Sequence, residues 1–381
     1  MLIRLMLATC LLWGSAAAGP RARDLGIPFD GVPGPLNAIT DVAGVTVGHT
    51  TLISGTDPKH MVRTGVTAVL PRGTKTASLP SFAGWFSLNG NGEMTGTTWL
   101  DESGMLEGPI LLTNTHSVGV VRDAAIAWRV KQGGADNSGY WWSLPVVGET
   151  WDGYLNDVNG FHVHPEHVAD AIDSARGGAV AEGNVGGGTG MICHEFKCGI
   201  GTASRVVKIG QTHYTVGVLV QSNYGLRDTL RIAGVPVGQH LREHRVYTED
   251  AHDLETGSII IIVATDAPLL PHQLKRVARR ASLGLARNGT YSGNGSGDIF
   301  VAFSNANAEG VTGATENTAR FIGNDDLDPV FLGAVEATEE AIINAMVAAK
   351  DLTGQHGHYA IAIPHQALQD LLRRYGRLTL P

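Results

Sequence analysis

Short apolar runs bounded by glycine alternate with segments of helical spacing along the chain, and this alternation restricts the fold more than any other feature. Runs of this length predict buried strands, and they lie at 64–70, 109–113, 214–221, 259–264, 299–303 and 359–363. Helical spacing occurs at 117–131, 166–176, 271–286, 328–350 and 366–375. Pro271 suits a first helical turn, and Asp328 before Pro329 predicts a helix cap. Strands and helices mixed over the whole length predict a layered α/β fold.

Composition agrees with a folded chain and excludes several classes. Of the 381 residues 43% are hydrophobic and 17% charged, so the chain can bury a core. The 50 glycines have no G-X-Y period, which excludes collagen and predicts tight turns and close backbone approaches. The 28 Lys and Arg against 36 Asp and Glu give a net charge of −8 without a basic run, which argues against a nucleic-acid partner.

Residues 1–18 have the pattern of a secretory signal peptide. Arg4 precedes an apolar stretch at 5–13, and Ala16-Ala17-Ala18 supplies a small-residue cleavage site. The stretch is far shorter than the roughly 20 residues of a membrane span. We therefore expect cleavage after Ala18, a periplasmic or secreted location, and a soluble protein without a membrane partner.

The two cysteines after the signal peptide, Cys193 and Cys198, leave two interpretations open. In an oxidising compartment they could form a local disulfide, or they could remain two thiols. A C-x₄-C pair without a second pair is a poor zinc site. The cluster His162, His164 and His167 fits the polar start of a helix better than a metal site. Since the chain also lacks an HExxH motif, we expect no metal.

An abrupt change of polarity occurs at Gly257-Ser258. The segment 239–256 is densely charged, and 259–263 is the most apolar short run after the signal peptide. One interpretation is a long surface loop that enters a central strand. The other is a cut before Ser258, which would make this serine a new N-terminus. An N-terminal serine carries a nucleophilic hydroxyl and, in an α-amino group with a pKa near neutral, its own base.

Seven segments in a fixed order identify a resemblance to a known family. They are 36–49 (LNAITDVAGVTVGH), 145–153 (PVVGETWDG), 181–190 (AEGNVGGGTG), 214–223 (YTVGVLVQSN), 257–258 (GS), 264–273 (ATDAPLLPHQ) and 293–298 (GNGSGD). From 23 to 365 the chain resembles the self-processing aminopeptidases. This family includes the L-aminopeptidase/D-amidase/D-esterase (DmpA) and the bacterial β-peptidyl aminopeptidases.

The resemblance implies both a fold and a processed chain. The fold would be a four-layer α/β/β/α sandwich like that of the N-terminal-nucleophile hydrolases, with the distinct connectivity shared by DmpA and the ornithine acetyltransferases. Self-cleavage would give an α subunit of 19–257 and a β subunit of 258–381. Family members assemble as homotetramers of αβ units and need no cofactor, and we expect the same here.

The resemblance also implies the catalytic residues. Ser258 matches the nucleophile, and Asn223 matches the residue whose side-chain amide stabilises the oxyanion. Ser296 and Asp298 match the serine and acid pair that orients and charges the amine of the nucleophile. Some β-aminopeptidases have glutamate at the position of Asp298, which changes the reach of the carboxylate but not its charge.

Four further residues are candidates for contacts with the substrate. Glu149 lies where a pocket carboxylate is expected, and a buried carboxylate would bind the free substrate amine. Asp298 is a second candidate for binding this amine, and the alternative for each of the two is a structural hydrogen bond to a glycine-rich turn. Trp151 stands where the family often has tyrosine, and Asn114 and Thr115 follow a predicted strand whose end could line the site. The run 183–190 lacks a P-loop lysine and fits close backbone packing better than a phosphate site.

These observations predict an exported serine aminopeptidase that acts on small peptides, amides or esters with a free N-terminal amine. The released residue could be a β-amino acid such as β-alanine, a small L-residue or a D-alanine derivative. One alternative is an acyl or aminoacyl transferase of the same fold, which secretion disfavours. The other is a catalytically silent periplasmic binding protein, which would require an uncut chain.

Overall fold

The larger of two main sheets contains the predicted nucleophile. The structure, a computed structural model, describes residues 19–74, 79–133, 142–246, 257–308 and 315–379, so the expected signal peptide at 1–18 lies outside the described residues. The sheet has the strand order β4-β3-β12-β11-β10-β9. Its strands are β3 (Ser81–Gly90), β4 (Met105–Leu106), β9 (Ile200–Ile209), β10 (Thr212–Asn223), β11 (Ser258–Thr265) and β12 (Gly297–Ser304). Strand β11 is antiparallel to β10 and parallel to β12.

A second sheet of four strands has the order β1-β2-β5-β6. Its strands are β1 (Thr46–Ser54), β2 (Val62–Leu70), β5 (Ile110–Asn114) and β6 (Val146–Thr150). Two shorter pairs join β7 (Ile192–Cys193) to β8 (Phe196–Lys197) and β13 (Leu352–Thr353) to β14 (Tyr359–Ala360).

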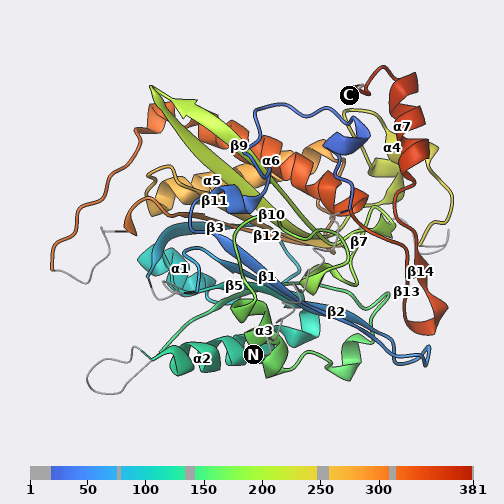
Figure 1. Cartoon of the computed structure of the whole chain (residues 1–381), viewed down its shortest axis with the longest axis horizontal. Coiled ribbons are helices and arrows are strands. Elements are labelled where there is room, and N and C mark those ends of the chain that lie inside the picture. Colours follow the sequence, from blue (N-terminus) through green and yellow to red (C-terminus); the bar gives the residue numbers. More distant parts are fainter. Residues whose placement is uncertain (1–18, 75–78, 134–141, 247–256, 309–314, 380–381) are drawn as a thin grey trace, which may run out of the picture.

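Helices cover the outer face of each main sheet. In Figure 1, α5 (Pro271–Arg287) and α6 (Asp328–Val347) lie over the six-stranded sheet, and α2 (Val118–Gln132) and α3 (Pro165–Asp173) lie against the four-stranded sheet. The remaining α-helices of the described chain are α1 (Thr97–Ser103), α4 (Val237–His240) and α7 (His365–Arg374).

Three apolar layers hold these elements together, and strand β11 contributes to two of them. Ile259, Ile261 and Val263 pack in the layer beneath α5 and α6. Ile260 and Ile262 pack between the two sheets. A third layer joins the four-stranded sheet to α2 and α3. All of β11 is buried because it has an apolar neighbour on each face, which explains its unbroken apolar run. The expected four-layer α/β/β/α sandwich is confirmed.

Four expectations about elements need correction. The predicted strand at 359–363 is paired only at Tyr359–Ala360, because the following backbone bonds elsewhere: Ile361 O accepts from Lys197 N and Ala362 N donates to Asp351. Two helices end three residues earlier than predicted, α6 at Val347 rather than at 350 and α3 at Asp173 rather than at 176. Asp328 is the first residue of α6, and Leu327 rather than Asp328 is its N-cap.

Strands β1, β3, β6 and β9 lie outside every predicted segment. Strand β3 illustrates why: past Gly84 its side chains are only half-buried or exposed, so it lacks the continuous apolar run of a buried strand. Its place in the sheet comes from pairing with β12. That partner is distant in sequence and leaves no local signal.

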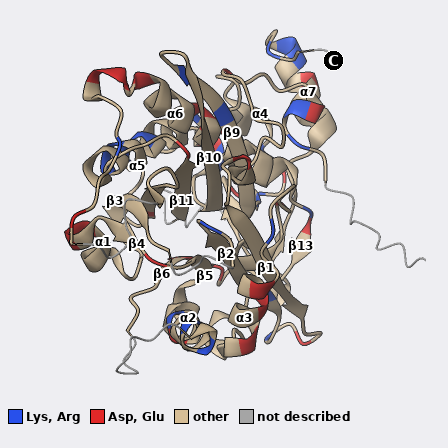
Figure 2. Ribbon diagram, turned by 60° about the vertical axis from the view of Figure 1, so that its left-hand side comes forward, with Lys and Arg blue, Asp and Glu red and all other residues tan. Residues whose placement is uncertain are grey.

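Charged residues lie mainly on helices and loops around uncharged central strands. Figure 2 shows blue and red segments interspersed over the helices, with β10 and β11 tan. In the described part of the chain, no helix has the length and apolar character to cross a membrane.

His164 is the N-cap of α3, and its backbone N–H donates to His167 Nδ1 (3.0 Å), which confirms the helix-start interpretation of these histidines.

Candidate active site

A cavity of about 670 Å³ opens at the beginning of β11, between the two sheets. Its walls combine glycine-rich backbone with several polar side chains. They are formed by Gly90, Asn91, Gly92, Glu93, Thr115, Glu149, Trp151, Ser258 and Gly295. Three predicted substrate-site residues and the predicted nucleophile therefore meet in one cavity.

Ser258 is the first residue of β11 and is 6% exposed. It lies opposite Asn223 of β10 on one side and Gly297 of β12 on the other. Strand alternation places its side chain on the same face as Ile260, toward the four-stranded sheet that carries Glu149. The fold therefore directs the hydroxyl into the space between the sheets.

Gly257 fits its position only because it has no side chain. A Cβ atom there would lie 2.3 Å from Tyr224 Cα and 2.6 Å from Asn223 O. The backbone of the predicted cleavage site therefore lies directly against the end of β10. The Gly257 carbonyl also accepts a hydrogen bond of 3.1 Å from Gly297 N, which holds the Gly257-Ser258 junction between its two neighbouring strands.

The side-chain amide of Asn223 is bonded at both ends. Its Oδ1 accepts from Ile192 N (2.8 Å), and its Nδ2 donates to Trp151 O (2.9 Å). An asparagine amide nitrogen carries two hydrogens. Trp151 O accepts from one of them, so the second is available to another acceptor. The oxyanion role of Asn223 stays a prediction.

Ser296 and Asp298 flank Gly297, the partner of Ser258 in the sheet. The Ser296 hydroxyl donates to Asp298 Oδ1 (2.7 Å), and both side chains are buried. A Cβ at Gly297 would approach Asn91 O to 2.5 Å, so glycine also permits the loop after β3 to close over this pair. The structure thus brings the predicted serine and acid pair together beside the strand position of Ser258.

Glu149 makes a structural hydrogen bond to a glycine-rich loop, one of the two predicted alternatives, and it also lies on the cavity wall. It lines the cavity at 3% exposure, and its Oε1 accepts from Glu93 N (2.9 Å) in the loop after β3. Its Oε2 accepts from the Thr115 hydroxyl. Burial raises the pKa of Glu149 above its ordinary value, although these two hydrogen bonds oppose the shift.

Asn114 and Trp151 have different surroundings. Trp151 lines the cavity with its side chain 42% exposed. The Asn114 side chain does not line the cavity: its Nδ2 donates to Thr64 Oγ1 (2.8 Å), and its Oδ1 accepts from Ser117 N (3.0 Å). Asn114 thus joins β2 to the turn that follows β5. Its neighbour Thr115 is the residue that reaches the cavity.

The loop of Asn91, Gly92 and Glu93 forms part of the cavity but was not among the predicted site residues. Pairing of β3 with β12 carries this loop to the site from a distant part of the sequence. The only local signal is the Gly90-Asn91-Gly92 cluster, which indicates a turn without indicating a site.

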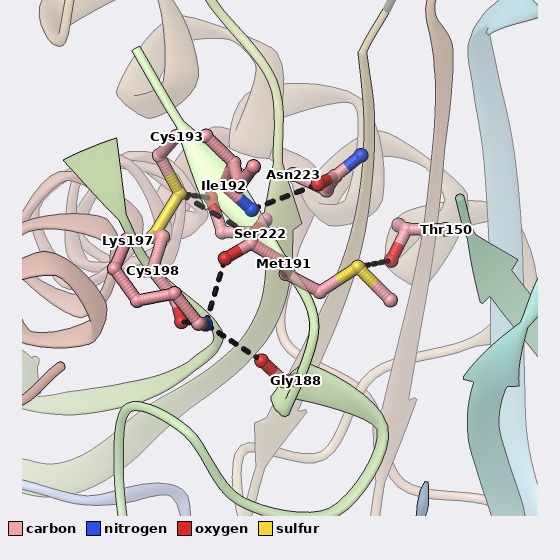
Figure 3. Close-up of a disulfide and its surroundings, with 9 residues drawn as sticks. All are labelled: Thr150, Gly188, Met191, Ile192, Cys193, Lys197, Cys198, Ser222 and Asn223. Atoms are coloured by element: carbon pink, nitrogen blue, oxygen red, sulfur yellow. Dashed lines mark hydrogen bonds between the residues drawn. A yellow bond between two sulfur atoms is a disulfide. The ribbon is translucent and has the colours of Figure 1, made fainter. Parts of the chain in front are cut away.

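The two cysteines form a disulfide close to Asn223. Cys193 and Cys198 are bonded, with their Cα atoms 5.3 Å apart, so the disulfide rather than the two-thiol interpretation is correct. Figure 3 shows the disulfide next to Ser222 and Asn223.

In the described parts of the chain there is no group of three His, Cys, Asp or Glu residues that could hold a metal ion.

Comparison with known proteins connects this cavity to a family. Residues 37–360 match the model of peptidase family S58. The chain is 54% identical to the β-peptidyl aminopeptidase BapA of Sphingosinicella microcystinivorans, over 98% of this chain and 97% of the relative. It is 47% identical to the BapA of Sphingosinicella xenopeptidilytica, over 97% and 96% of the two chains.

A solved structure gives the same result for the fold. The L-aminopeptidase D-Ala-esterase/amidase of Ochrobactrum anthropi superposes with a TM-score of 0.87 at 49% identity, covering 94% of this chain and 99% of that one. That enzyme is described as a prototype of the serine aminopeptidases and as a variant of the Ntn hydrolase fold. The present chain therefore belongs to peptidase family S58 and is an aminopeptidase with this variant of the Ntn hydrolase fold.

Proposed function

We propose that this chain is an exported, self-processing serine aminopeptidase whose nucleophile is Ser258, freed as an N-terminus by a cut after Gly257. The observation that carries the proposal is the position of Ser258. It begins a central strand on the wall of the cavity, opposite Asn223 and beside the pair Ser296 and Asp298. The signal-peptide pattern of residues 1–18 supports export to the periplasm or the medium.

Before the cut, the Ser258 nitrogen belongs to a peptide bond and is not a base. The Ser258 hydroxyl attacks the Gly257 carbonyl carbon, and the C–N bond breaks to give an ester and a free Ser258 amine. Water then hydrolyses the ester. The Gly297 N–H already donates to the Gly257 carbonyl oxygen, so a donor is in place for the charge that develops there.

After the cut, the Ser258 amine acts as the general base for its own hydroxyl. The hydroxyl oxygen attacks the first peptide, amide or ester carbonyl of the substrate, and Asn223 donates to the oxyanion. The proton passes to the leaving group, an acyl-enzyme remains, and water releases the N-terminal residue. Ser296 and Asp298 orient the amine and favour its charged form as it takes the proton.

Glu149 supplies the recognition of a free substrate amine. A carboxylate that faces a partly closed cavity binds an ammonium group more strongly than one in water. The names of the relatives support β-amino residues, L-residues and D-alanine esters or amides as substrate classes. We also propose assembly into a homotetramer of αβ units, without a cofactor.

Replacing Glu149 with glutamine should raise KM about 10- to 100-fold, the effect of losing a hydrogen bond to a charged group. It should also change the pH profile. Binding requires ionised Glu149, whose raised pKa means that affinity is lost as pH falls through that value. The Ser258 amine must also be deprotonated. In a plot of log kcat/KM against pH, the slope on the acid side should therefore approach two.

In the Glu149→Gln variant the limiting acid slope should fall to one, because only the Ser258 amine still titrates. Glu93→Gln is the matched control, since Glu93 is an exposed carboxylate on the rim of the same cavity. It should keep both the slope and a KM within about threefold of the original value, as an exposed charge contributes little. If KM and the acid slope were unchanged in Glu149→Gln, the assignment of Glu149 to recognition of the substrate amine would be wrong.

Intact mass and N-terminal sequencing of the exported protein test the central proposal. We expect two fragments, 19–257 and 258–381, the second beginning Ser-Ile-Ile-Ile. The cut protein should release N-terminal residues from β-alanyl and D-alanyl amides. A single active chain beginning at Gly19 would contradict the N-terminal-nucleophile mechanism.

A further inference from the structure

A disulfide-closed hairpin contacts the predicted oxyanion residue. Strands β7 and β8 are joined by a two-residue turn at His194 and Glu195, both in the left-handed region with φ of 47° and 64°. Turns of this kind favour Asn-Gly, and each non-glycine residue there costs about 1–2 kcal/mol. The two turn residues therefore destabilise the hairpin, and other contacts must stabilise it.

Those contacts include one covalent bond. The Cys193–Cys198 disulfide closes the hairpin at its base. At the turn, Arg227 donates from Nε to His194 O (2.9 Å) and from Nη2 to Glu195 O (2.7 Å). Below the disulfide, the buried ammonium of Lys197 donates to Met191 O (2.8 Å), directly before Ile192 (Figure 3).

The closed hairpin packs against the end of β10 on both sides of Asn223. Gly199 O accepts from Ser222 N (3.0 Å), and His194 N donates to Tyr224 O (2.7 Å). Cys193 Sγ lies 3.1 Å from Ser222 Oγ. Between these contacts, Ile192 N, one residue before the disulfide, donates to Asn223 Oδ1 (2.8 Å).

This contact and the one to Trp151 O together determine which end of the Asn223 amide is the donor. The two ends of an asparagine amide have nearly the same shape, so only hydrogen bonds distinguish them. In the observed orientation Ile192 N faces Oδ1 and Trp151 O faces Nδ2. A flipped amide would set N–H against N–H and carbonyl against carbonyl, and would present an acceptor where the oxyanion needs a donor. If the hairpin loosened, Ile192 could no longer enforce this choice.

We infer that the Cys193–Cys198 disulfide is a positioning element for the oxyanion site: it holds Ile192 N against Asn223 Oδ1 and thereby keeps the amide donor toward the reacting carbonyl. The inference rests on the proposed role of Asn223 in the cut enzyme. Because the oxyanion exists only during the reaction, loss of the disulfide should lower kcat while leaving KM nearly unchanged.

The test is a double-mutant cycle on exported, cut enzyme, with kcat normalised to the fraction of chain beginning at Ser258. Cys193→Ala/Cys198→Ala should lower kcat about 10-fold or more, as small displacements of reacting groups do. KM should stay within about twofold. When Asn223→Ala is already present, removing the disulfide should change kcat by less than about twofold, because residues that act as a unit are non-additive.

The main result of a second measurement comes from the wild-type enzyme and does not depend on whether the variant folds. The cut enzyme is reduced with a phosphine, and the fraction of reduced chain is measured in samples by alkylation and mass. The kcat of the unalkylated enzyme should fall in proportion to this fraction. It should return when the enzyme is reoxidised. The Cys193→Ala/Cys198→Ala enzyme is the control and should not respond to the phosphine.

Unchanged kcat after loss of the disulfide in cut, active enzyme would overturn this inference and leave the proposed function intact. An equal loss of kcat with and without Asn223 would also overturn it, since the disulfide would then act elsewhere. A wild-type chain that is uncut and inactive would instead contradict the proposed function.

Discussion

Replacing Ser258 with alanine is expected to leave a single uncut chain that begins at Gly19 and has no aminopeptidase activity. In the proposed mechanism the Ser258 hydroxyl attacks the Gly257 carbonyl, so the variant should form no α and β fragments. It lacks the same hydroxyl for the substrate, and removing a serine nucleophile costs on the order of 10⁶-fold in kcat in a comparable serine hydrolase. Intact mass reports the first effect and release of an N-terminal residue reports the second.

Two controls separate chemistry from folding in this experiment. Ser282→Ala removes a hydroxyl from the exposed surface of α5 and should be cut and fully active. Ser258→Thr keeps a hydroxyl and should still be cut, though more slowly. A Ser258→Ala protein that nevertheless separates between 257 and 258 would mean that another group or a contaminating protease makes the cut.

Replacing Asn223 with alanine should lower kcat about 100- to 1000-fold, the usual effect of removing one oxyanion donor. In the proposed mechanism the amide of Asn223 donates to charge that appears only in the transition state, so KM should stay within about threefold. Steady-state kinetics on enzyme whose cut fraction is known by mass measure both constants.

Asn184→Ala is the matched control for this substitution. Asn184 is another asparagine bonded at both amide ends: its Nδ2 donates to Lys350 O (2.8 Å) and its Oδ1 accepts from Lys350 N (3.1 Å). Unlike Asn223, it is not paired with Ser258 in the sheet, and it does not line the cavity, so its loss should leave kcat unchanged. A change confined to KM in Asn223→Ala would assign Asn223 to substrate binding instead of the oxyanion.

Local pattern was sufficient for the parts of the fold whose signal is local. Strand β11 could be predicted because residues 259–264 form an unbroken apolar run, and α5 because its apolar residues recur at helical spacing after Pro271. Strand β3 could not, because its half-exposed side chains resemble a loop. What makes it a strand is its hydrogen bonding to β12.

The same distinction applies to the site. Ser258 and Glu149, which the family resemblance implied, lie in one cavity with Thr115, which was predicted from its place after a strand. Asn114 is the last residue of β5 and directly precedes Thr115, but its side-chain amide is hydrogen-bonded to Thr64 and Ser117. Residue type alone does not reveal in which direction such a side chain points. The Asn91–Glu93 loop is close to Ser258 only because two distant strands pair.

The strand order has a consequence for the lifetime of the enzyme. After a cut at Gly257-Ser258, the six-stranded sheet would read α, α, β, β, α, α in subunit origin, with β12 and β11 enclosed between β3 and β10. Neither subunit could leave without dismantling the sheet. Once separated, the two polypeptides would have to reassociate before the enzyme could refold. The rate of reassembly would depend on their concentration, whereas the rate of unfolding and separation would not. The persistence of such an enzyme outside the cell would be governed by its rate of unfolding rather than by an equilibrium.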